Sequence, residues 1–300
     1  MKLGIDVGGT KTKVAVINDT YEIIAANSYP TVTGPEAFVE FIAALIKDYR
    51  CSFPEIACVG IGIPGKVNTG KNRGYLVYSP ALQIQNMDLC QVLSDACGLP
   101  IFAENDVNAW ALAEKAVGSC KEVDNYVLIA IGTGIGSGIV IGGRVYHGFN
   151  YEAGEIGYMV SEEDFGSPCP SKSDFGAFER KASAIAISCR YYKLTGEQID
   201  TREIFIRALQ HGDQIALDLI QKQMRALAVG ISNIICLLQP QKIVIGGGLA
   251  GEGEYLIQHL NQYVRRLIPT EVPVVLSGAG KWGGAVGAAL SAEISAPKEV

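Results

Sequence analysis

The sequence lacks the features that mark several large classes of protein. It has no basic excess, since 25 Lys and Arg stand against 31 Asp and Glu for a net charge of −6, and this balance argues against a nucleic-acid surface. No stretch approaches the roughly 20 apolar residues of a membrane span, and no basic and apolar leader pattern opens the chain. We therefore expect a soluble, cytoplasmic protein whose partner is a small molecule, with no nucleic-acid or membrane partner.

The eight cysteines also lack the spacing of a disulfide framework. They are scattered along the chain, form no Cys-x-x-Cys pair, and lie mostly within apolar stretches. This usage is typical of the reduced interior of a cytosolic protein. We expect these cysteines to be reduced and buried.

Glycine is the one residue type in marked excess, with 35 in the chain against a typical share of about 7%. The glycines gather where apolar, β-like runs end, first in residues 6–11 (DVGGTK). Because Gly8 and Gly9 carry no Cβ atom, successive N–H groups and the Thr10 hydroxyl can converge on phosphate oxygens. Asp6, at the strand end, is placed to hold the water shell of a phosphate-bound Mg²⁺. A tight hairpin without a ligand is the alternative for this run alone.

The order of apolar and amphipathic stretches predicts an α/β protein. The first half reads as strands at 3–7, 13–17 and 23–28, a helix at 36–49, a strand at 56–63, a helix at 89–97, a strand at 101–103 and a helix from about Val107. The second half reads as strands at 126–131 and 136–141, a helix at 213–238, a strand at 242–245, a helix after Gly253, a strand at 272–276 and a helix from about Gly283.

A glycine turn follows the strand at 126–131 as another follows the first strand, which suggests a duplication. We expect two lobes with mixed sheets covered by helices, made of residues 1–117 with 283–300 and of residues 118–282. A single doubly wound sheet is the alternative, but its G-x-G-x-x-G motif should open a helix rather than a hairpin.

Several motifs occur together in one order along the chain. They are residues 6–11 (DVGGTK), 62–65 (GIPG), 104–106 (END), 132–138 (GTGIGSG), 152–157 (EAGEIG) and 246–248 (GGG). In this order they resemble the ROK family of sugar kinases over essentially the whole chain. The resemblance implies an actin-like ATPase fold of two ribonuclease-H-like lobes, ATP in the cleft between them, a hexose beneath its γ-phosphate, and a homodimer. The residues implied for ATP are Asp6, Gly8, Gly9, Thr10, Lys11, Gly132, Thr133, Gly134, Gly136, Gly247 and Gly248.

Transfer of a phosphoryl group to a sugar hydroxyl needs a carboxylate that accepts the hydroxyl proton. Asp106 follows the strand at 101–103 and lies at a helix start, and it is our candidate for this base. An N-cap role, worth about 1 kcal/mol, is the alternative for this aspartate. The sugar contacts expected beside it are the Gly65 backbone, Asn105, Glu155, Tyr158 and Glu179. Either glutamate is alternatively a surface charge.

The chain departs from the family where other members bind zinc. Relatives commonly place a histidine after E-I-G and carry a later C-x-C-G-x-x-G-C-x-E stretch; here these positions hold Tyr158, a lone Cys169 and Ala177. One thiol cannot hold a structural Zn²⁺, which takes four ligands. We therefore expect no zinc site, and a loop at 161–173 that is ordered by prolines, packing or substrate, or is mobile.

Two departures from the family pattern, at Tyr158 and Ala81, concern the sugar-binding site. Tyr158 should alter the pocket wall near C1 and C2, so we hypothesise that substituents are tolerated there, as in a β-glucoside or an N-acyl hexosamine. Ala81 stands where many relatives have a sugar-binding asparagine, which leaves the contacts on that side open.

The sequence as a whole predicts an ATP-dependent sugar kinase with Asp106 as base, Mg²⁺ bridging the phosphates, and transfer most often to O6. A sugar-sensing repressor of the same family is an alternative, but no helix-turn-helix fits before Leu3. A nucleotide switch without a small substrate is another, but it would leave Asn105, Asp106 and Glu155 without a purpose.

Overall fold

The chain folds into two compact units. The computed structural model describes residues 1–70, 74–171 and 174–294. Unit 1 comprises Met1–Glu122, Gly138–Ala153 and Gly278–Val300, and unit 2 comprises Val123–Ser137 and Gly154–Ser277. The lobes expected from the sequence differ from these units over residues 118–122, 138–153 and 278–282, and they stay a prediction. Residues 295–300 of the first expected lobe lie outside the described residues.

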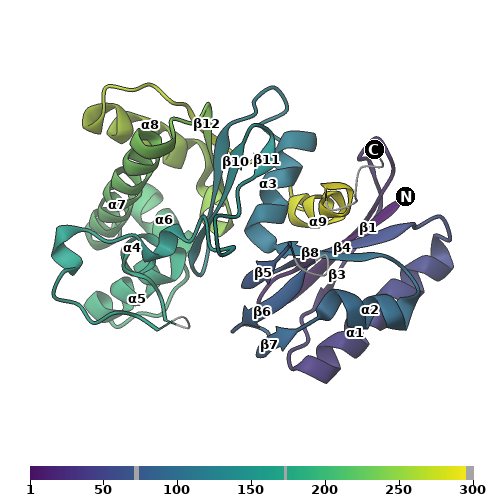
Figure 1. Ribbon diagram of the computed structural model, residues 1–300. Coiled ribbons are helices and arrows are strands. Elements are labelled where there is room, and N and C mark those ends of the chain that lie inside the picture. The colour runs from purple at the N-terminus through teal and green to yellow at the C-terminus, as the bar shows by residue number, and fades with distance from the viewer. Residues whose placement is uncertain (71–73, 172–173, 295–300) are drawn as a thin grey trace. The chain divides into compact units, whose positions relative to one another are not determined.

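Unit 1 is built on a five-stranded mixed sheet of order β3-β2-β1-β4-β8 (Figure 1). The expected meander is confirmed, because β1 (Lys2–Val7) pairs antiparallel with β2 (Lys11–Ile17), and β2 pairs antiparallel with β3 (Ile23–Pro30). On the other side of β1, the strands β4 (Cys58–Ile63) and β8 (Ile101–Asn105) continue the sheet in parallel.

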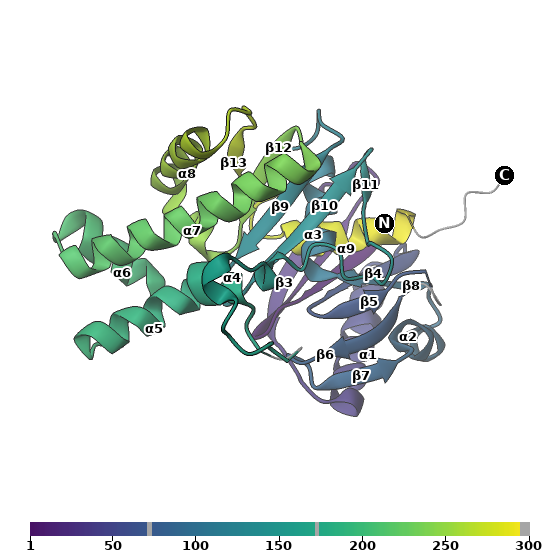
Figure 2. The same cartoon turned by 60° about the vertical axis from the view of Figure 1, so that its left-hand side comes forward.

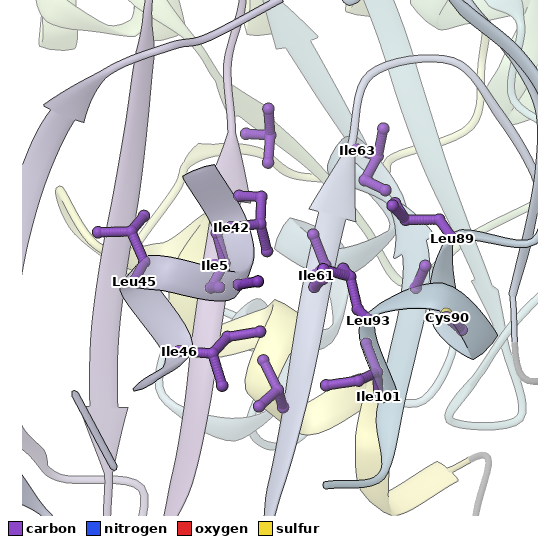
Figure 3. Close-up of a cluster of buried hydrophobic side chains, with 14 of the residues drawn as sticks. Ile5, Ile42, Leu45, Ile46, Ile61, Ile63, Leu89, Cys90, Leu93 and Ile101 are labelled. Atoms are coloured by element: carbon purple, nitrogen blue, oxygen red, sulfur yellow. The ribbon is translucent and has the colours of Figure 1, made fainter. Parts of the chain in front are cut away.

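Alternation along β1 and β4 decides which helices cover each face of this sheet. One face carries branched apolar side chains, which pack against α1 (Pro35–Ser52) and α2 (Leu89–Cys97). Figure 3 shows this core, with Ile5, Ile61, Ile63 and Ile101 from the strands, Ile42, Leu45 and Ile46 from α1, and Leu89, Cys90 and Leu93 from α2.

The opposite face carries glycine at the strand centres. A Cβ at Gly4 or Gly60 would collide with the backbone of α9 (Gly283–Ile294). The two glycines therefore let α9 lie directly on the sheet, and α3 (Asp106–Ala116) packs beside α9 through a backbone contact of Gly287 with Ala109.

Unit 1 also contains a small antiparallel sheet that the sequence did not predict. It consists of β5 (Lys66–Asn68), β6 (Tyr75–Ser79) and β7 (Ile84–Met87). These strands are three to five residues long and mix polar with apolar residues, so no clear period of two marks them.

The second sheet repeats the strand order of the first, with order β11-β10-β9-β12-β13. It comprises β9 (Tyr126–Ile131), β10 (Ile135–Ile141), β11 (Arg144–Val145), β12 (Lys242–Gly246) and β13 (Val274–Leu276). The strands β10 and β11 form a hairpin, while β12 runs parallel to both β9 and β13. A hairpin followed by parallel strands in both sheets confirms the duplication suggested by the two glycine turns.

The remaining helices belong to unit 2 (Figure 2). They are α4 (Ala177–Ala182), α5 (Ala184–Thr195), α6 (Thr201–Gln210), α7 (Gln214–Leu238) and α8 (Gly253–Leu267), with 3₁₀ turns at Ile156–Tyr158 (η1), Glu162–Asp164 (η2) and Gly248–Glu252 (η3). The long expected helix is α7, whose N-cap Asp213 accepts the Ala216 N–H at 3.0 Å. Within the described residues, no helix is both long and apolar enough to span a membrane.

The prediction that the cysteines are buried is wrong for half of them. Cys90, Cys97 and Cys120 are buried and Cys58 is half-buried, but Cys51, Cys169, Cys189 and Cys236 are exposed. Three of the exposed cysteines lie on amphipathic helices, at positions outside the buried stripe. An apolar neighbourhood in sequence did not reveal which side of the helix each one occupies.

Candidate active site

The first glycine turn joins β1 to β2, and hydrogen bonds from Thr31 fix its backbone. The Gly8 N–H donates to the Lys11 carbonyl at 3.0 Å, and the Thr31 hydroxyl donates to the Gly8 carbonyl at 2.7 Å. The Thr31 N–H donates to the Thr10 carbonyl at 3.1 Å. Gly9, Thr10 and Lys11 are exposed, so the tip of this hairpin is ordered yet open to solvent.

Three motif glycines have no sterically required role in the fold itself. A Cβ at Gly9, Gly132 or Gly248 would meet no atom within 4 Å, and none of the three has a left-handed φ. Alanine would therefore fit the protein at each position. Glycine there suits the close approach of a ligand to the backbone.

Asp6 lies at the end of β1 with its side chain 17% exposed. Its one polar partner within the described residues is the Lys13 ammonium, with Nζ 3.8 Å from Oδ2. Burial raises the pKa of the Asp6 carboxyl above its ordinary value, and the Lys13 charge only partly offsets this. A buried carboxyl with so little hydrogen bonding fits a site for a cation and its water shell.

Asp106 is the first residue of α3, and its neighbour Asn105 is the N-cap. The Asn105 Oδ1 atom accepts the N–H groups of Val107 at 3.0 Å and Asn108 at 3.1 Å, while its Nδ2 donates to the Gly65 carbonyl at 3.1 Å. The alternative that Asp106 is only the N-cap is therefore wrong, because Asn105 already fills that position. The structure brings Asn105, Asp106 and Gly65 together.

Asp6 and Asp106 lie on the same face of the unit 1 sheet. Asp6 is the register partner of Gly62 in the β1–β4 ladder, and the Asp106 Cα lies 3.4 Å from where a Gly62 Cβ would be. Glycine at position 62 therefore leaves room for the start of α3 beside the strand that carries Asp6.

Two residues of this region, Glu104 and His147, were not singled out from the sequence. The Glu104 side chain is 6% exposed, and its Oε2 lies 2.7 Å from the His147 Nε2. Burial lowers the pKa of His147, but the hydrogen bond and charge of Glu104 raise it above its ordinary value. Only the rarity of histidine, three in the chain, marked His147 in the sequence.

The second glycine turn, in unit 2, is tight and solvent-facing. The Gly132 N–H donates to the Gly134 carbonyl at 3.0 Å, and the Gly132 carbonyl accepts the Ala184 N–H at 2.9 Å from the first residue of α5. Thr133 is exposed at the tip, and Gly136 lies within β10. This turn resembles the first one in being ordered from one side and open on the other.

Glu179 lies beside the second glycine turn rather than on the surface. Its Oε1 accepts the Ile135 N–H at 2.9 Å, and its Oε2 accepts the Gly176 N–H at 2.8 Å as part of the α4 capping box. A Cβ at Gly157 would lie 2.6 Å from its carboxyl carbon. Within unit 2, the carboxylate thus joins the start of α4 to the second glycine turn and lies close to Gly157.

The other expected residues of unit 2 lie at turns. Glu155 is exposed and immediately precedes η1. Gly247 has φ +87°, and a Cβ there would lie 2.6 Å from the Ile131 nitrogen, so only glycine fits. Gly248 is exposed at the start of η3.

Tyr158, which replaces the family histidine, reaches the stretch where the cysteines would be. Its hydroxyl donates to the Asp174 carbonyl at 3.2 Å. The Asp174 carboxylate in turn accepts the N–H and hydroxyl of Ser171, at 2.9 and 2.8 Å. A hydrogen bond thus joins η1 to the segment that contains Asp174.

The start of the 161–173 loop is held by a second Ser–Asp pair. The Asp164 Oδ2 accepts the N–H of Ser161 at 2.8 Å and its hydroxyl at 2.9 Å, and lies 2.7 Å from the Lys181 ammonium. The hydrogen bonds from Lys181 and Ser161 lower the pKa of Asp164 to about 2. These Ser–Asp turns hold the loop in a way that was not predicted from the sequence.

The prediction that the chain has no zinc site is not tested over the whole 161–173 loop. Lys172 and Ser173 lie outside the described residues. Among the residues that are described, no three His, Cys, Asp or Glu side chains are grouped to hold a metal ion.

These features define a class of protein. Two units with repeated sheet order, a glycine turn after the first strand of each sheet, and carboxylates at a strand end and a helix start are those of an actin-like ATPase fold with two ribonuclease-H-like halves. The model of the ROK family matches residues 2–294. The chain belongs to the ROK family.

Three relatives illustrate the family. The chain is 31% identical to a glucokinase of Streptomyces coelicolor over 96% of both chains. It is 31% identical to a beta-glucoside kinase of Listeria monocytogenes over 84% of each. Among solved structures, a ROK family glucokinase from Streptomyces griseus, in complex with glucose and AMPPNP, has a TM-score of 0.81 at 26% identity, covering 96% of this chain and 97% of that one.

Proposed function

We propose that this protein is an ATP-dependent sugar kinase that transfers the γ-phosphoryl group of ATP to a hydroxyl of a hexose-type sugar. The observation that carries the proposal is Asp106, held at the first turn of α3 by the Asn105 cap and lying on the same sheet face as Asp6. The glucokinase and beta-glucoside kinase relatives support the reaction class. They are of this chain's length, so the likeness is not confined to one unit.

Asp106 accepts the proton of the attacking hydroxyl in this proposal. A base contributes by taking that proton as the oxygen attacks phosphorus. Its position is fixed because Asn105 bonds the helix start on one side and the Gly65 carbonyl on the other. The second N–H of the Asn105 side-chain amide is proposed to bind the sugar. Further proposed sugar-binding groups are the Gly65 backbone, Glu155, Tyr158 and Glu179.

The two glycine turns bind the phosphates of ATP in this proposal. Gly8, Gly9, Thr10 and Lys11 contribute in unit 1. Their counterparts in unit 2 are Gly132, Thr133, Gly134 and Gly136, with Gly247 and Gly248 near the adenosine. The open space in front of Gly9, Gly132 and Gly248 supports this assignment.

Asp6 is the group proposed to hold magnesium, through water. Its burial and sparse hydrogen bonding fit that ion. When bound, Mg²⁺ would neutralise phosphate charge. Lys13, 3.8 Å from Asp6, keeps one positive charge beside the carboxylate.

The acceptor is proposed to be a sugar substituted near C1 or C2, such as a β-glucoside or an N-acyl hexosamine, with O6 as the phosphorylated hydroxyl. Tyr158 stands where relatives carry a histidine, and its hydroxyl is directed to the Asp174 carbonyl. A cytoplasmic homodimer is proposed as the working form, on the family resemblance.

The proposal is tested by coupled measurement of ADP release from ATP and Mg²⁺ across glucose, cellobiose, aryl-β-glucosides and N-acetylmannosamine. Sugar-dependent turnover is expected, and equal ADP release with and without every sugar would reject a kinase. Efficient turnover of glucose with none of the substituted sugars would reject only the acceptor assignment.

The Asp106→Asn variant tests the base. It should lower kcat by at least ~10²-fold with unchanged thermal stability, because Asn keeps the size of the side chain. Asp19→Asn is the matched control, since Asp19 is 87% exposed. Near-normal turnover of Asp106→Asn would remove Asp106 from this role.

A further inference from the structure

A buried carboxylate directly precedes the proposed base and its cap. Glu104 is the penultimate residue of β8 and is 5% exposed. Its Oε1 accepts the Asn105 N–H at 2.8 Å and the Asn108 Nδ2 at 3.1 Å, and its Oε2 lies 2.7 Å from the His147 Nε2. One carboxylate therefore engages three groups, two of which flank Asp106 in the sequence.

These contacts bear on the orientation of Asp106. Asn105 precedes it and caps the helix, and Asn108 lies in the first turn of the same helix. Glu104 bonds the backbone of the first and the side chain of the second. The start of α3 is thus held from the strand side by Glu104, while the Asn105 side chain holds it to Gly65.

The third partner, His147, comes from a segment far along the chain. It lies after β11 in a loop closed by the Ala153 N–H, which donates to the His147 carbonyl at 3.1 Å. The Tyr151 ring lies 6.1 Å from the imidazole, and Tyr151 has a left-handed φ of +58°. Backbone strain at a non-glycine residue persists where surrounding contacts fix it, often at functional sites.

A second ionic contact joins the same loop to another part of unit 1. The Lys66 Nζ lies 3.1 Å from the Glu152 Oε1, and the Lys66 side chain is 8% exposed. Lys66 directly follows Gly65, the residue whose carbonyl receives Asn105. The loop therefore contacts a neighbour of each residue in the Gly65–Asn105 hydrogen bond. His147 binds Glu104, which precedes Asn105, and Glu152 binds Lys66, which follows Gly65.

The charge on His147 depends on pH, and one charged group faces it. Within the described residues the imidazole bonds only Glu104, its side chain is 25% exposed, and its Nδ1 has no hydrogen-bond partner. The Tyr151 ring, from the same loop, also lies beside the imidazole. Because Glu104 outweighs the effect of burial, the pKa of His147 lies above its ordinary value of 6.5. Below that raised pKa the contact with Glu104 is a charge-assisted hydrogen bond.

We propose that Glu104 and His147 are positioning residues for phosphoryl transfer, which tie the 147–153 loop to the Asn105–Asp106 turn and so fix the direction of the base. This inference rests on the proposed function. Neither residue touches the sugar or ATP; they act through the backbone of Asn105 and the side chain of Asn108. Deprotonation of His147 weakens the tie and lowers kcat.

The experiment compares the full-length wild type with Glu104→Gln and His147→Gln. It uses the best sugar of the panel and measures kcat and both KM values from pH 5.5 to 9. Wild-type kcat is expected to fall as pH rises through the pKa of His147, and His147→Gln should lack this change. Each variant should lose about 10- to 100-fold in kcat with the KM for ATP within about twofold, because only the base side of the reaction is displaced. His211→Gln, at an exposed helix end, is the matched control.

A spectroscopic readout keeps the test decisive if a variant does not fold. The imidazole proton signals of the wild type are titrated with and without saturating sugar, and His147 is assigned by elimination with His211→Gln and His259→Gln. A His147 pKa above 6.5 that moves on sugar binding is expected. A pKa at or below that value and unaffected by sugar would overturn the proposal.

Folded variants that match wild-type kcat and its pH dependence would overturn the positioning role and leave the kinase proposal intact. Absence of sugar-dependent turnover in the wild type would instead reject the proposed function itself.

Discussion

Replacing the buried Glu114 should destabilise unit 1 more than replacing an acidic residue at the surface. Glu114 lies in α3 and is fully buried. Its Oε2 accepts the N–H groups of Ser119 at 2.8 Å and Gly278 at 3.1 Å, and its Oε1 accepts the Ala279 N–H at 3.2 Å. One carboxylate thus joins Ser119, five residues after Glu114, to Gly278 and Ala279, which lie 164 and 165 residues after Glu114.

The magnitude follows from these three bonds. A hydrogen bond to a charged group contributes about 1.5–3 kcal/mol, but the three share one carboxylate, and alanine also removes the penalty for burying its charge. We therefore expect Glu114→Ala to lower the free energy of unfolding by about 3 kcal/mol. Glu114→Gln keeps one carbonyl acceptor and should lose about half as much.

The assay is urea unfolding followed by tryptophan fluorescence. Both tryptophans, Trp110 and Trp282, belong to unit 1, so the signal reports this unit. Glu122→Gln is the control, because Glu122 is exposed and should change the stability by less than about 0.5 kcal/mol. A Glu114→Ala protein with the same midpoint as this control would refute the reasoning.

Three further predictions concern the glycine turn, pH and the loop without zinc. Gly9→Ala should fold as stably as the wild type, since the added Cβ meets no atom, but it should raise the KM for ATP about tenfold. Gly4→Ala should instead lower the free energy of unfolding by about 1–3 kcal/mol, because its Cβ collides with the backbone of α9. Steady-state kinetics and urea unfolding distinguish the two effects. Glu104 raises the pKa of His147 in the folded protein. The contact between them therefore stabilises the fold fully below the unfolded pKa of about 6.5, and this stabilisation is lost as pH rises through the folded pKa. The urea midpoint should accordingly fall over this range when it is measured from pH 5.5 to 9. Lys181→Met removes a 2.7 Å ion pair and should speed proteolysis of the adjoining loop, while EDTA leaves the wild-type rate unchanged; an EDTA-sensitive loop would contradict this.

The sequence predicted the strands that carry both glycine turns because their apolar runs are long and end in glycine. The strands at 3–7 and 126–131 correspond to β1 and β9. It did not predict the short strands β5 to β7 or the helices α4 to α6. The three strands are formed by pairing with one another rather than by a pattern within each.

Some residues of the candidate site could be named from the sequence, and others became apparent only in the structure. Motif residues such as Asp6 and Asp106 could be named in advance, because their chemistry is set by residue type and by position at a strand end or helix start. Glu104 and His147 could not be paired, since 43 residues separate them and only the fold brings them into contact. The role of Asn105 as N-cap also depended on a helix boundary one residue earlier than expected.

The central claim is that this chain phosphorylates a sugar with ATP. The most direct measurement is mass spectrometry of the products formed by the wild-type enzyme from ATP, Mg²⁺ and each sugar of the panel, with Asp106→Asn run beside it. The account predicts a sugar monophosphate from at least one sugar, formed at least ~10²-fold more slowly by the variant. ADP and inorganic phosphate without any phosphorylated sugar would contradict it.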